Sequence, residues 1–481
     1  MKLSFILPVY KTEKYLAKCV KSLVAQSLKD WEAIFVLDGP SQEAREIISM
    51  HLKGKHKVIE IEHGGACKAR NEGFKHSTGE YVVFFDSDCA IECDAAQAWV
   101  DIFDREKDIG FVYAGYKWFE EQYGGYPSEQ FDPWMLRVNN YISSCFPLRR
   151  DLFPGWNEDL KSLQDWDFWL KVVEKGAKGH YMVGYAFSTP YPDIDSISGK
   201  GCTPEVWLER LEAVKKLHNI PINETCVTSI NYRHEGIRLA KMIDADYRDG
   251  VNDKPNRYKT IVQIGFDFSH DKAQSHCSNF SKNGARNILF WTKEDIVQAY
   301  NMVAKRALDE YSEKINQICT QFVEDRESQK MMKGCGFNVS VMPLPFAAKH
   351  ETKPLPEKPR FLVDISGHYH QIFSVIDRSL PDVKLDLANE AQEIDDYHGI
   401  IHFHREPLIS NSVKRMLLSG RHVISNIEQP FMGYMDDRQA PDTFIPKIVE
   451  KIRAIPDFGI NQKGLEYYKK MLNVGGLAEV L

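Results

Sequence analysis

The sequence predicts an α/β protein with parallel sheets in two domains. The chain has 481 residues, and single hydrophobic cores usually stop growing near about 250 to 300 residues. Its first part alternates short apolar runs with amphipathic stretches, which is typical of a parallel sheet covered by helices on both faces. A second series of this kind follows a polar segment with Gly and Pro at residues 249–256. We therefore expect one domain over residues 1–249 and another over residues 250–481.

The elements of the first domain follow from its periodicity. We expect strands at residues 3–7, 31–37, 58–61, 81–85 and 109–116. The run at 81–85 is apolar throughout, as in a strand that is buried on both faces. We expect helices at residues 13–26, 41–52, 66–76, 163–174, 204–218 and 224–247, of which the last two close the domain.

The second domain is expected to contain another parallel arrangement. Its predicted strands lie at residues 260–264, 288–291, 339–342, 361–365, 400–403 and 422–425. A segment with three prolines near residues 350–359 interrupts the series. We therefore expect two small lobes that divide there.

Composition excludes several classes of protein. Hydrophobic residues make up 43% of the chain and its net charge is -7, so no global positive field holds a polyanion. No window approaches the ~20 apolar residues that a membrane-spanning helix needs, and the opening residues 1–8 fit a strand better than a signal peptide. The ten cysteines include no Cys-x-x-Cys pair. These features predict a soluble, cytoplasmic protein with reduced structural thiols.

Polar residues follow three of the predicted strands. Tyr10, Asp38 and the Asp86-Ser87-Asp88 segment each come at or just after a strand end. In open α/β sheets, ligands bind outside the carboxyl ends of the strands. Two carboxylates that lie two residues apart share one face of an extended segment and can reach one divalent ion. An isolated Asp-x-Asp is more often a polar turn that closes a buried strand.

Ordered motifs resolve this ambiguity. The segments 4–10 (SFILPVY), 36–39 (VLDG), 69–73 (ARNEG) and 79–88 (GEYVVFFDSD) resemble the family 2 glycosyltransferases in order and spacing. Segments 155–160 and 164–170 continue the resemblance, which covers about residues 1–200. It implies a GT-A fold, a nucleotide-diphosphate-sugar donor with UDP favoured, and inversion at the anomeric carbon. The implied acceptor is a hydroxyl of a glycan or glycoconjugate.

The resemblance also implies the donor-side residues. An Asp accepts a hydrogen bond from a uracil imide, an aromatic ring packs on the base, and Arg donates to carbonyl or phosphate oxygens. A divalent ion, Mn or Mg, neutralises the diphosphate leaving group. The residues implied for the nucleotide sugar are Pro8, Tyr10, Asp38, Arg70, Asp86 and Asp88, and those implied for the metal are Asp88 and Asp86.

Inversion by direct displacement needs a general base that takes the proton of the acceptor hydroxyl. Asp165 is the candidate base. The family usually has Glu before this Asp, whereas this chain has Gln164. Asp167 and Asp159 are the alternative bases, and acids at a helix start also serve the helix dipole alone.

Tryptophans near the candidate base are possible acceptor contacts. Trp156, Trp166 and Trp169 are candidates to stack on an acceptor sugar, although Trp166 and Trp169 lie three residues apart on a predicted helix and fit the core equally well. Segment 191–198 lies where relatives often carry a His before a Ser. It contains no His, so we assign it no metal or phosphate contact.

The second half shows weaker signals. Segments 337–345, 361–364 and 412–426 look like the GT-B glycosyltransferase fold, but the Glu that such a domain normally places before the Gly420-Arg421 turn is absent from 413–418. An acceptor-binding or architectural role is therefore expected here, and a second transferase site stays open. Four histidines fit ligand-facing positions better than a metal site: His368, His370, His402 and His404.

Three hypotheses about function remain. The first is the transferase, which the joint presence of Asp86, Asp88 and Asp165 favours. The second is a non-catalytic protein that binds glycans or nucleotides and has kept the fold. The third is that both halves transfer sugars. A loose basic stretch also keeps a polyanionic acceptor such as modified nucleic acid open, and its residues are Lys254, Arg257, Lys259, Lys272, Lys282 and Arg286. The sequence predicts neither the sugar nor the oligomeric state.

Overall fold

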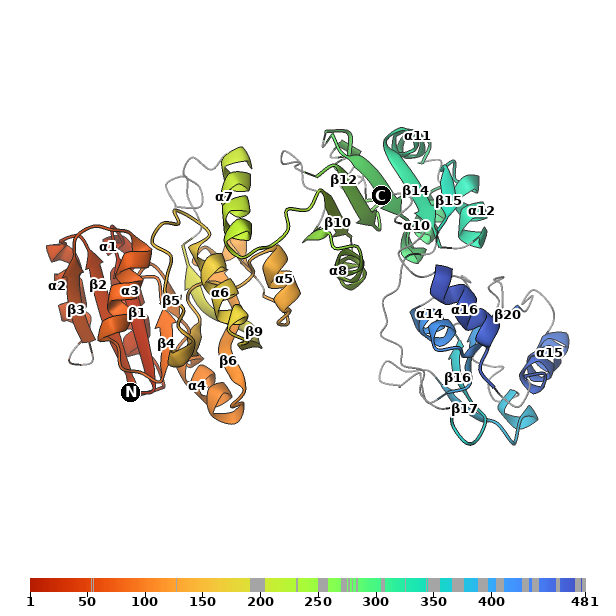
Figure 1. Ribbon diagram of the computed structural model, residues 1–481, viewed down its shortest axis with the longest axis horizontal. Helices are drawn as coiled ribbons and strands as arrows, with labels where there is room; N and C mark the ends of the chain where they lie inside the picture. The colour runs from red at the N-terminus through yellow and green to blue at the C-terminus, as the bar shows by residue number, and fades with distance from the viewer. Residues whose placement is uncertain are drawn as a thin grey trace. The chain divides into compact units, whose positions relative to one another are not determined.

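The structure is a computed structural model in which the chain forms two compact units, Met1–Ile222 and Asn223–Leu481 (Figure 1). The described residues are 1–52, 54, 56–126, 128–190, 204–230, 232–249, 258–269, 275, 277–278, 280–282, 284–303, 308–324, 326–342, 344, 355–365, 376–387, 397–403, 411–425, 432–434, 441–455, 459–471 and 477.

The first unit is built on a nine-stranded mixed sheet with the order β3-β2-β1-β4-β8-β6-β9-β5, in which β7 pairs with β6. Strands β1 to β4 are parallel neighbours, whereas β8 runs antiparallel to β4 and β6. The strands are β1 (Leu3–Val9), β2 (Trp31–Asp38), β3 (His56–Ile61), β4 (Tyr81–Phe84), β5 (Ala90–Ile91), β6 (Ile109–Trp118), β7 (Gly125–Tyr126), β8 (Pro147–Arg149) and β9 (Lys178–Thr189).

Helices cover this sheet and account for its apolar strands. Every residue of β2 and β4 is buried, as expected for strands with helices on both faces. Helix α3 packs on β1 and β2, and a Cβ on its Gly73 would lie 2.4 Å from Ile6 Cγ2, so only glycine permits this approach. The helices are α1 (Glu13–Val24), α2 (Gln42–His51), α3 (Ala66–His76), α4 (Ala95–Arg105), α5 (Pro133–Val138), α6 (Gln164–Glu174) and α7 (Pro204–Leu217).

The second unit contains two separate parallel sheets. The first has the order β11-β10-β12-β13-β14-β15, the Rossmann-like arrangement in which the chain starts inside the sheet and adds strands on both sides. Its helices are α8 (Arg233–Met242), α10 (Lys293–Val303), α11 (Asp309–Ile318) and α12 (Arg326–Gly334). Its strands are β10 (Thr225–Ser229), β11 (Asp246–Asp249), β12 (Thr260–Ile264), β13 (Arg286–Phe290), β14 (Cys319–Val323) and β15 (Val339–Val341).

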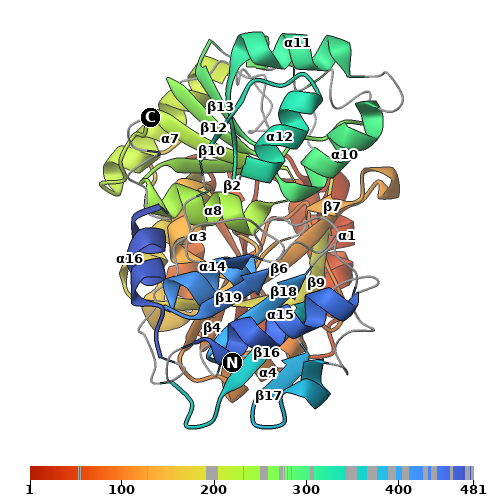
Figure 2. The same cartoon turned by 90° about the vertical axis from the view of Figure 1, so that its right-hand side faces the viewer.

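The other sheet of this unit has the order β17-β16-β18-β19-β20. Alternate strand residues point to its two faces: Val363 and Ile401 pack with α15, whereas Leu362 and Ile400 pack with α14 and α16. Figure 2 labels this sheet and its helices. Its strands and helices are β16 (Arg360–Ile365), β17 (Lys384–Leu387), β18 (Gly399–Phe403), β19 (His422–Ser425), β20 (Gly433–Tyr434), α14 (Asn411–Leu418), α15 (Pro441–Arg453) and α16 (Gln462–Met471). In the part of the chain that is described, none of the helices has the length and apolar character to traverse a bilayer.

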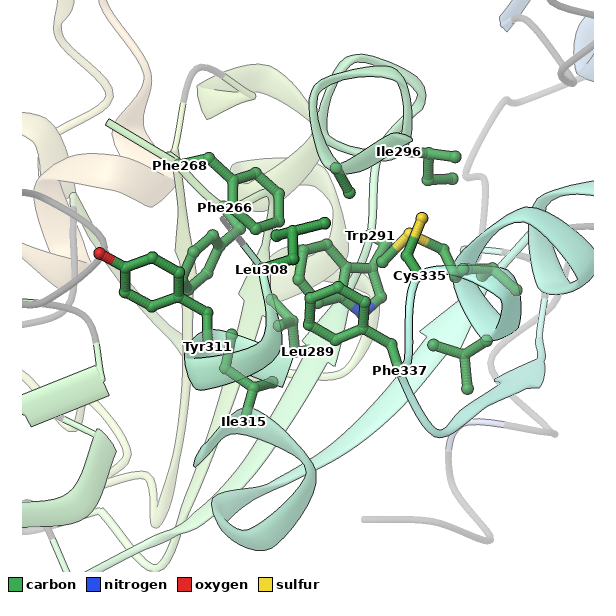
Figure 3. Packing of buried hydrophobic residues seen from close by; sticks show 14 of the residues in the cluster. Phe266, Phe268, Leu289, Trp291, Ile296, Leu308, Tyr311, Ile315, Cys335 and Phe337 are labelled. Atoms are coloured by element: carbon green, nitrogen blue, oxygen red, sulfur yellow. The ribbon is translucent and has the colours of Figure 1, made fainter. Parts of the chain in front are cut away.

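Aromatic packing forms the core of the six-stranded sheet of the second unit (Figure 3). The rings of Phe268 and Trp291 stack with centroids 5.6 Å apart, and Phe337 lies 4.8 Å from Trp291. The indole Nε1 of Trp291 donates to Gln321 Oε1 at 3.0 Å, so its polar atom is satisfied in the core. This half of the chain thus has a hydrophobic core of its own.

The division between the units differs from the predicted boundary at 249. The helix predicted at 224–247 is wrong, because this stretch forms β10, α8 and β11. Strand β10 pairs with both β11 and β12, so pairing in the second unit decides its conformation. The predicted linker at 249–256 connects two strands of one sheet, and residues 250–257 lie outside the described residues. The predicted division near 350–359 falls between β15 and β16.

We expect a fragment of residues 1–222 to fold alone and to be more soluble than a fragment of residues 1–249. The longer fragment carries β10 and β11 without β12, and an unpaired strand edge promotes aggregation. Soluble yield and thermal melting of both fragments measure this difference. Equal yield with the same melting temperature would contradict the boundary at Ile222.

Candidate active site

The carboxyl ends of β1, β2 and β4 meet at one edge of the first sheet, because these strands are parallel neighbours. Asp38 is the last residue of β2, Tyr10 follows β1, and Asp86 lies two residues after β4. Ser87 Oγ donates to the carbonyl oxygen of Pro8 at 2.7 Å. This bond ties the Asp-x-Asp segment to the end of β1, so the structure brings the predicted donor-side residues together.

The Asp38 carboxylate is enclosed by the loop before α3. Its side chain is 2% exposed, and it accepts hydrogen bonds from the main-chain nitrogens of Gly64 at 2.7 Å and Gly65 at 2.9 Å. His63 Nδ1 lies 3.0 Å from its Oδ2. Asp38 therefore fixes the loop that leads into α3, and its contact with a base stays a prediction.

His63 is a residue at this edge that the sequence analysis missed. Its ring stacks on Tyr10 with centroids 4.2 Å apart and planes 14° apart. The His63 side chain is 56% exposed and Tyr10 is 45% exposed, so the pair presents an aromatic surface to solvent. The only signal in the sequence was a ring-bearing residue directly before Gly64-Gly65 at the start of a helix.

Arg70 connects the donor side to the segment of the candidate base. Its Nη2 donates to Asp86 Oδ1 at 2.7 Å, its Nη1 lies 3.5 Å from Gln164 Oε1, and its guanidinium lies 4.4 Å from the Trp156 ring centre. Burial lowers the pKa of Arg70, but the charge and hydrogen bond of Asp86 outweigh this effect and raise it overall. Arg70 is therefore a fixed cation that holds Asp86, and its predicted contact with the nucleotide is untested.

Asp88 is a half-buried carboxylate beside Asp86. Burial, followed by the negative charge of Asp86, raises the pKa of Asp88 to about 6. A carboxylate whose ionisation is disfavoured by a neighbouring negative charge is stabilised by a nearby positive charge. Both offer oxygen atoms, the ligands that Mg and Mn prefer, so the pair fits the predicted divalent ion.

Asp165 lies in the first turn of α6. Its Oδ2 accepts from Asn140 Nδ2 at 2.8 Å and its Oδ1 accepts from the main-chain nitrogen of Trp166 at 3.0 Å. Burial raises the pKa of this carboxyl, and the charge of Asp86 adds to the rise, although the Trp166 bond and Arg70 oppose it. The result is a positioned and more basic carboxylate, which suits proton abstraction near neutral pH.

The two alternative bases have different surroundings. Asp167 is 1% exposed, accepts from Lys171 Nζ at 2.7 Å and lies 3.0 Å from His218 Nε2. Burial raises the pKa of Asp167, but these two partners lower it overall. Asp167 is thus a structural ion-pair residue, whereas Asp159 is solvent-exposed and its main-chain nitrogen donates to Asn157 Oδ1.

The tryptophans lie in the core and not on the acceptor surface that we predicted for Trp156 and Trp166. Trp156 is 4% exposed and stacks on Phe168 at 4.2 Å, and Trp166 is 1% exposed. The Trp166 Nε1 donates to the carbonyl oxygen of Leu136 at 2.6 Å. Apolar packing on both sides of α6 decides these positions, so neither ring offers a face to a sugar without a rearrangement.

Only some of the residues that the sequence analysis named in the second half belong to the described part of the chain. His402 is buried, with Nδ1 at 3.4 Å from Ser425 Oγ and Nε2 at 3.7 Å from Asp364 Oδ2. Lys259 pairs with Glu224 at 2.7 Å. Predicted features outside the described residues are segment 191–198, Lys254, Arg257, Lys272, His368, His370 and His404.

The match to a protein family lies in the first unit. Residues 4–158 match the family model of glycosyl transferase family 2. The chain is 36% identical over 126 residues to Glycosyltransferase GlyA of Streptococcus pneumoniae, which covers 26% of this chain and 18% of that protein. It is 35% identical over 112 residues to a Poly(ribitol-phosphate) beta-glucosyltransferase of Bacillus spizizenii, with coverage of 22% and 18%. The chain thus spans less than a fifth of the length of these two relatives.

A solved structure resembles part of the chain. It is residues 1–349 of S. aureus TarS in complex with UDP-GlcNAc, at 22% sequence identity and a TM-score of 0.40, and the match covers 45% of this chain and 66% of that one. The family match ends before the second unit. The GT-B resemblance of that unit therefore stays a prediction.

Proposed function

We propose that the glycosyltransferase family 2 domain formed by residues 4–158 makes this chain a metal-dependent, inverting transferase. The donor is a nucleotide-diphosphate sugar, with UDP favoured, and the acceptor is a hydroxyl of a glycan or glycoconjugate. The observation that carries this proposal is the arrangement of two acidic sites beside one buried arginine. Asp86 binds Arg70 directly, and Gln164, next to Asp165, lies on the other side of the same guanidinium.

The donor side is suited to a nucleotide. The exposed rings of Tyr10 and His63 offer a flat surface for the base, and Pro8 precedes them near the end of β1. Asp38 acts here through the loop that it fixes, since its oxygens already accept bonds from Gly64 and Gly65. Arg70 keeps Asp86 oriented toward the ribose end of the donor.

Asp88 and Asp86 would hold the divalent ion, Mn or Mg. When bound, such an ion neutralises the diphosphate and supports its departure as a leaving group. The chain itself contributes the two carboxylates and the hydrogen bonds that orient them. Because the Ser87 hydroxyl donates to Pro8, it accepts from the Thr12 hydroxyl at 2.8 Å, which ties this segment to the start of α1.

Asp165 takes the proton of the acceptor hydroxyl. Asn140 and the main chain of Trp166 each donate to one of its oxygens and so orient a carboxylate that burial makes more basic. The hydroxyl oxygen attacks the anomeric carbon opposite the departing diphosphate, and the configuration inverts. The base therefore stands on the acceptor side, and Arg70 and Asp86 stand on the donor side.

A polyanionic acceptor is the second candidate for the other substrate. This acceptor class is favoured by one relative, whose name is Poly(ribitol-phosphate) beta-glucosyltransferase. Transfer from a UDP-sugar to a phosphate-containing polymer, compared with a neutral glycan, distinguishes the two acceptor classes.

Thermal melting tests the donor and the metal together. We expect UDP or UDP-GlcNAc to raise the melting temperature of the first unit only when Mn or Mg is present. Ligand at about 100 times its Kd stabilises the native state by about 2.7 kcal/mol, or roughly 5 to 10 °C for a unit of this size. ADP serves as the control for the base. The same shift in EDTA would contradict the metal assignment.

A further inference from the structure

Three cysteine side chains lie close to Asp86 and Asp88. Cys19, Cys89 and Cys145 are buried and come from α1, from the segment after Asp88 and from the segment before β8. Cys145 Sγ accepts a hydrogen bond from the Asp86 main-chain nitrogen at 3.4 Å, and the Cys19 thiol contacts the Asp86 carbonyl oxygen at 3.9 Å. The Cys89 thiol points to Asp88 Oδ1 at 3.6 Å. The proposed transfer reaction uses none of these thiols.

Two of the thiols form a cluster with the Asp86 carboxylate. One ligand atom each from Asp86, Cys89 and Cys145 lie within 4.8 Å of one another. In a tetrahedral zinc site, with Zn–S bonds of ~2.3 Å and Zn–O bonds of ~2.1 Å, ligand atoms lie about 3.5 to 3.8 Å apart. A movement of about 1 Å or less would therefore close the group around an ion. We propose that Asp86, Cys89 and Cys145 form a second cation site, for thiophilic divalent ions such as Zn²⁺ and Cd²⁺.

The ligand types separate this site from that of the transferase ion. Thiolate sulfur favours soft or borderline cations, whereas Mg and Mn favour carboxylate oxygen and water. Each thiol releases its proton to solvent as its sulfur binds the ion, and the fourth position is left for water. Asp88 and Asp86 hold the hard ion, and Cys89, Cys145 and Asp86 hold the soft one, so the two sites share Asp86.

Occupancy of the cysteine site affects the donor side through Asp86. This carboxylate accepts from Arg70 at 2.7 Å and lies 3.4 Å from Ser144 Oγ. An ion that binds Asp86 competes with Arg70 for it and places positive charge beside a buried guanidinium. The site is therefore inhibitory, a consequence that rests on the proposed transferase function. The binding of the ion itself does not depend on that function.

Cadmium binding by the full, reduced chain tests the site directly. We expect an ultraviolet absorption band from cadmium–thiolate bonds that saturates at one equivalent. Cys89→Ser and Cys145→Ser should each weaken binding at least tenfold, about 1.4 kcal/mol. Cys93→Ser is the matched control, because Cys93 lies close in sequence but is exposed, and it should bind like the wild type.

A band of unchanged amplitude and affinity in the Cys89→Ser/Cys145→Ser double variant would overturn the proposal, as would the absence of a band in the wild type. Asp86→Asn keeps both thiols. If circular dichroism shows that this variant is folded, we expect it to give the cadmium band with a weaker affinity. An affinity equal to that of the wild type would show that Asp86 is not a ligand of this site. Zn²⁺ should also inhibit Mn-supported donor hydrolysis in the wild type and in Cys93→Ser. A clear cadmium band in a protein without any turnover would overturn the transferase and leave the site intact.

Discussion

Asp165→Asn is expected to lower kcat by about 10² to 10⁴-fold, or roughly 3 to 5 kcal/mol of transition-state stabilisation. The amide keeps the shape of the side chain but cannot accept the proton of the acceptor hydroxyl. Donor affinity should hardly change, because Asp86, Asp88 and Arg70 remain in place. Steady-state transfer, together with donor binding by calorimetry, measures this separation, which is the signature of an interaction made in the transition state.

Two matched variants control for loss of an acid near the same helix. Asp159→Asn removes an exposed carboxylate and should leave the rate near that of the wild type. Asp167→Asn weakens the buried contacts with Lys171 and His218, so it should lower the melting temperature more than kcat. Transfer by Asp165→Asn at the wild-type rate would exclude Asp165, and Asp159 would then be the next candidate base.

The sequence predicted most of the fold because its local patterns and its tertiary structure agree. The α/β class, the parallel sheets of the second half and the helix at 66–76 are confirmed. The family 2 resemblance is confirmed over residues 4–158. Strands buried on both faces, such as 81–84, are recognisable because they have no polar side.

Two of the strands that the sequence did not predict depend on pairing with neighbouring strands. β10 (Thr225–Ser229) is short and mostly polar, and its pairing with β11 and β12 makes it a strand. β14 (Cys319–Val323) likewise has only Phe322 and Val323 as strongly apolar residues. In both cases neighbours distant in sequence supply the stabilisation, so local propensity is a weak guide.

The sequence predicted which residues of the site follow strand ends, but it did not predict the contacts that these residues make. The position of Asp38 after β2 follows from the sequence, but its engagement by Gly64 and Gly65 depends on how the loop folds back. Cys145 shows the same limit, because its approach to Cys89 arises from the position of β8 beside β4 and has no spacing signal in the chain.

Replacement of Asp88 by Ala should affect both donor affinity and turnover. It removes the carboxylate proposed to hold the divalent ion, so the diphosphate loses its counterion in the bound state as well as in the transition state. We therefore expect the Mn-dependent rise in melting temperature with UDP to disappear and transfer to fall by at least about 10²-fold, or roughly 3 kcal/mol.

The metal-free protein provides the control that separates this effect from unfolding. Burial and the charge of Asp86 already disfavour the ionised form of Asp88 and raise its pKa to about 6. Because the folded state then binds the proton more tightly than the unfolded state, ionised Asp88 subtracts stability as the pH rises through this range. Asp88→Ala should therefore melt no lower than the wild type in EDTA at neutral pH, while it fails to respond to Mn and UDP. A variant that keeps the full Mn-dependent response would show that the ion is held elsewhere, and a variant that loses only kcat would place Asp88 on the acceptor side with Asp165.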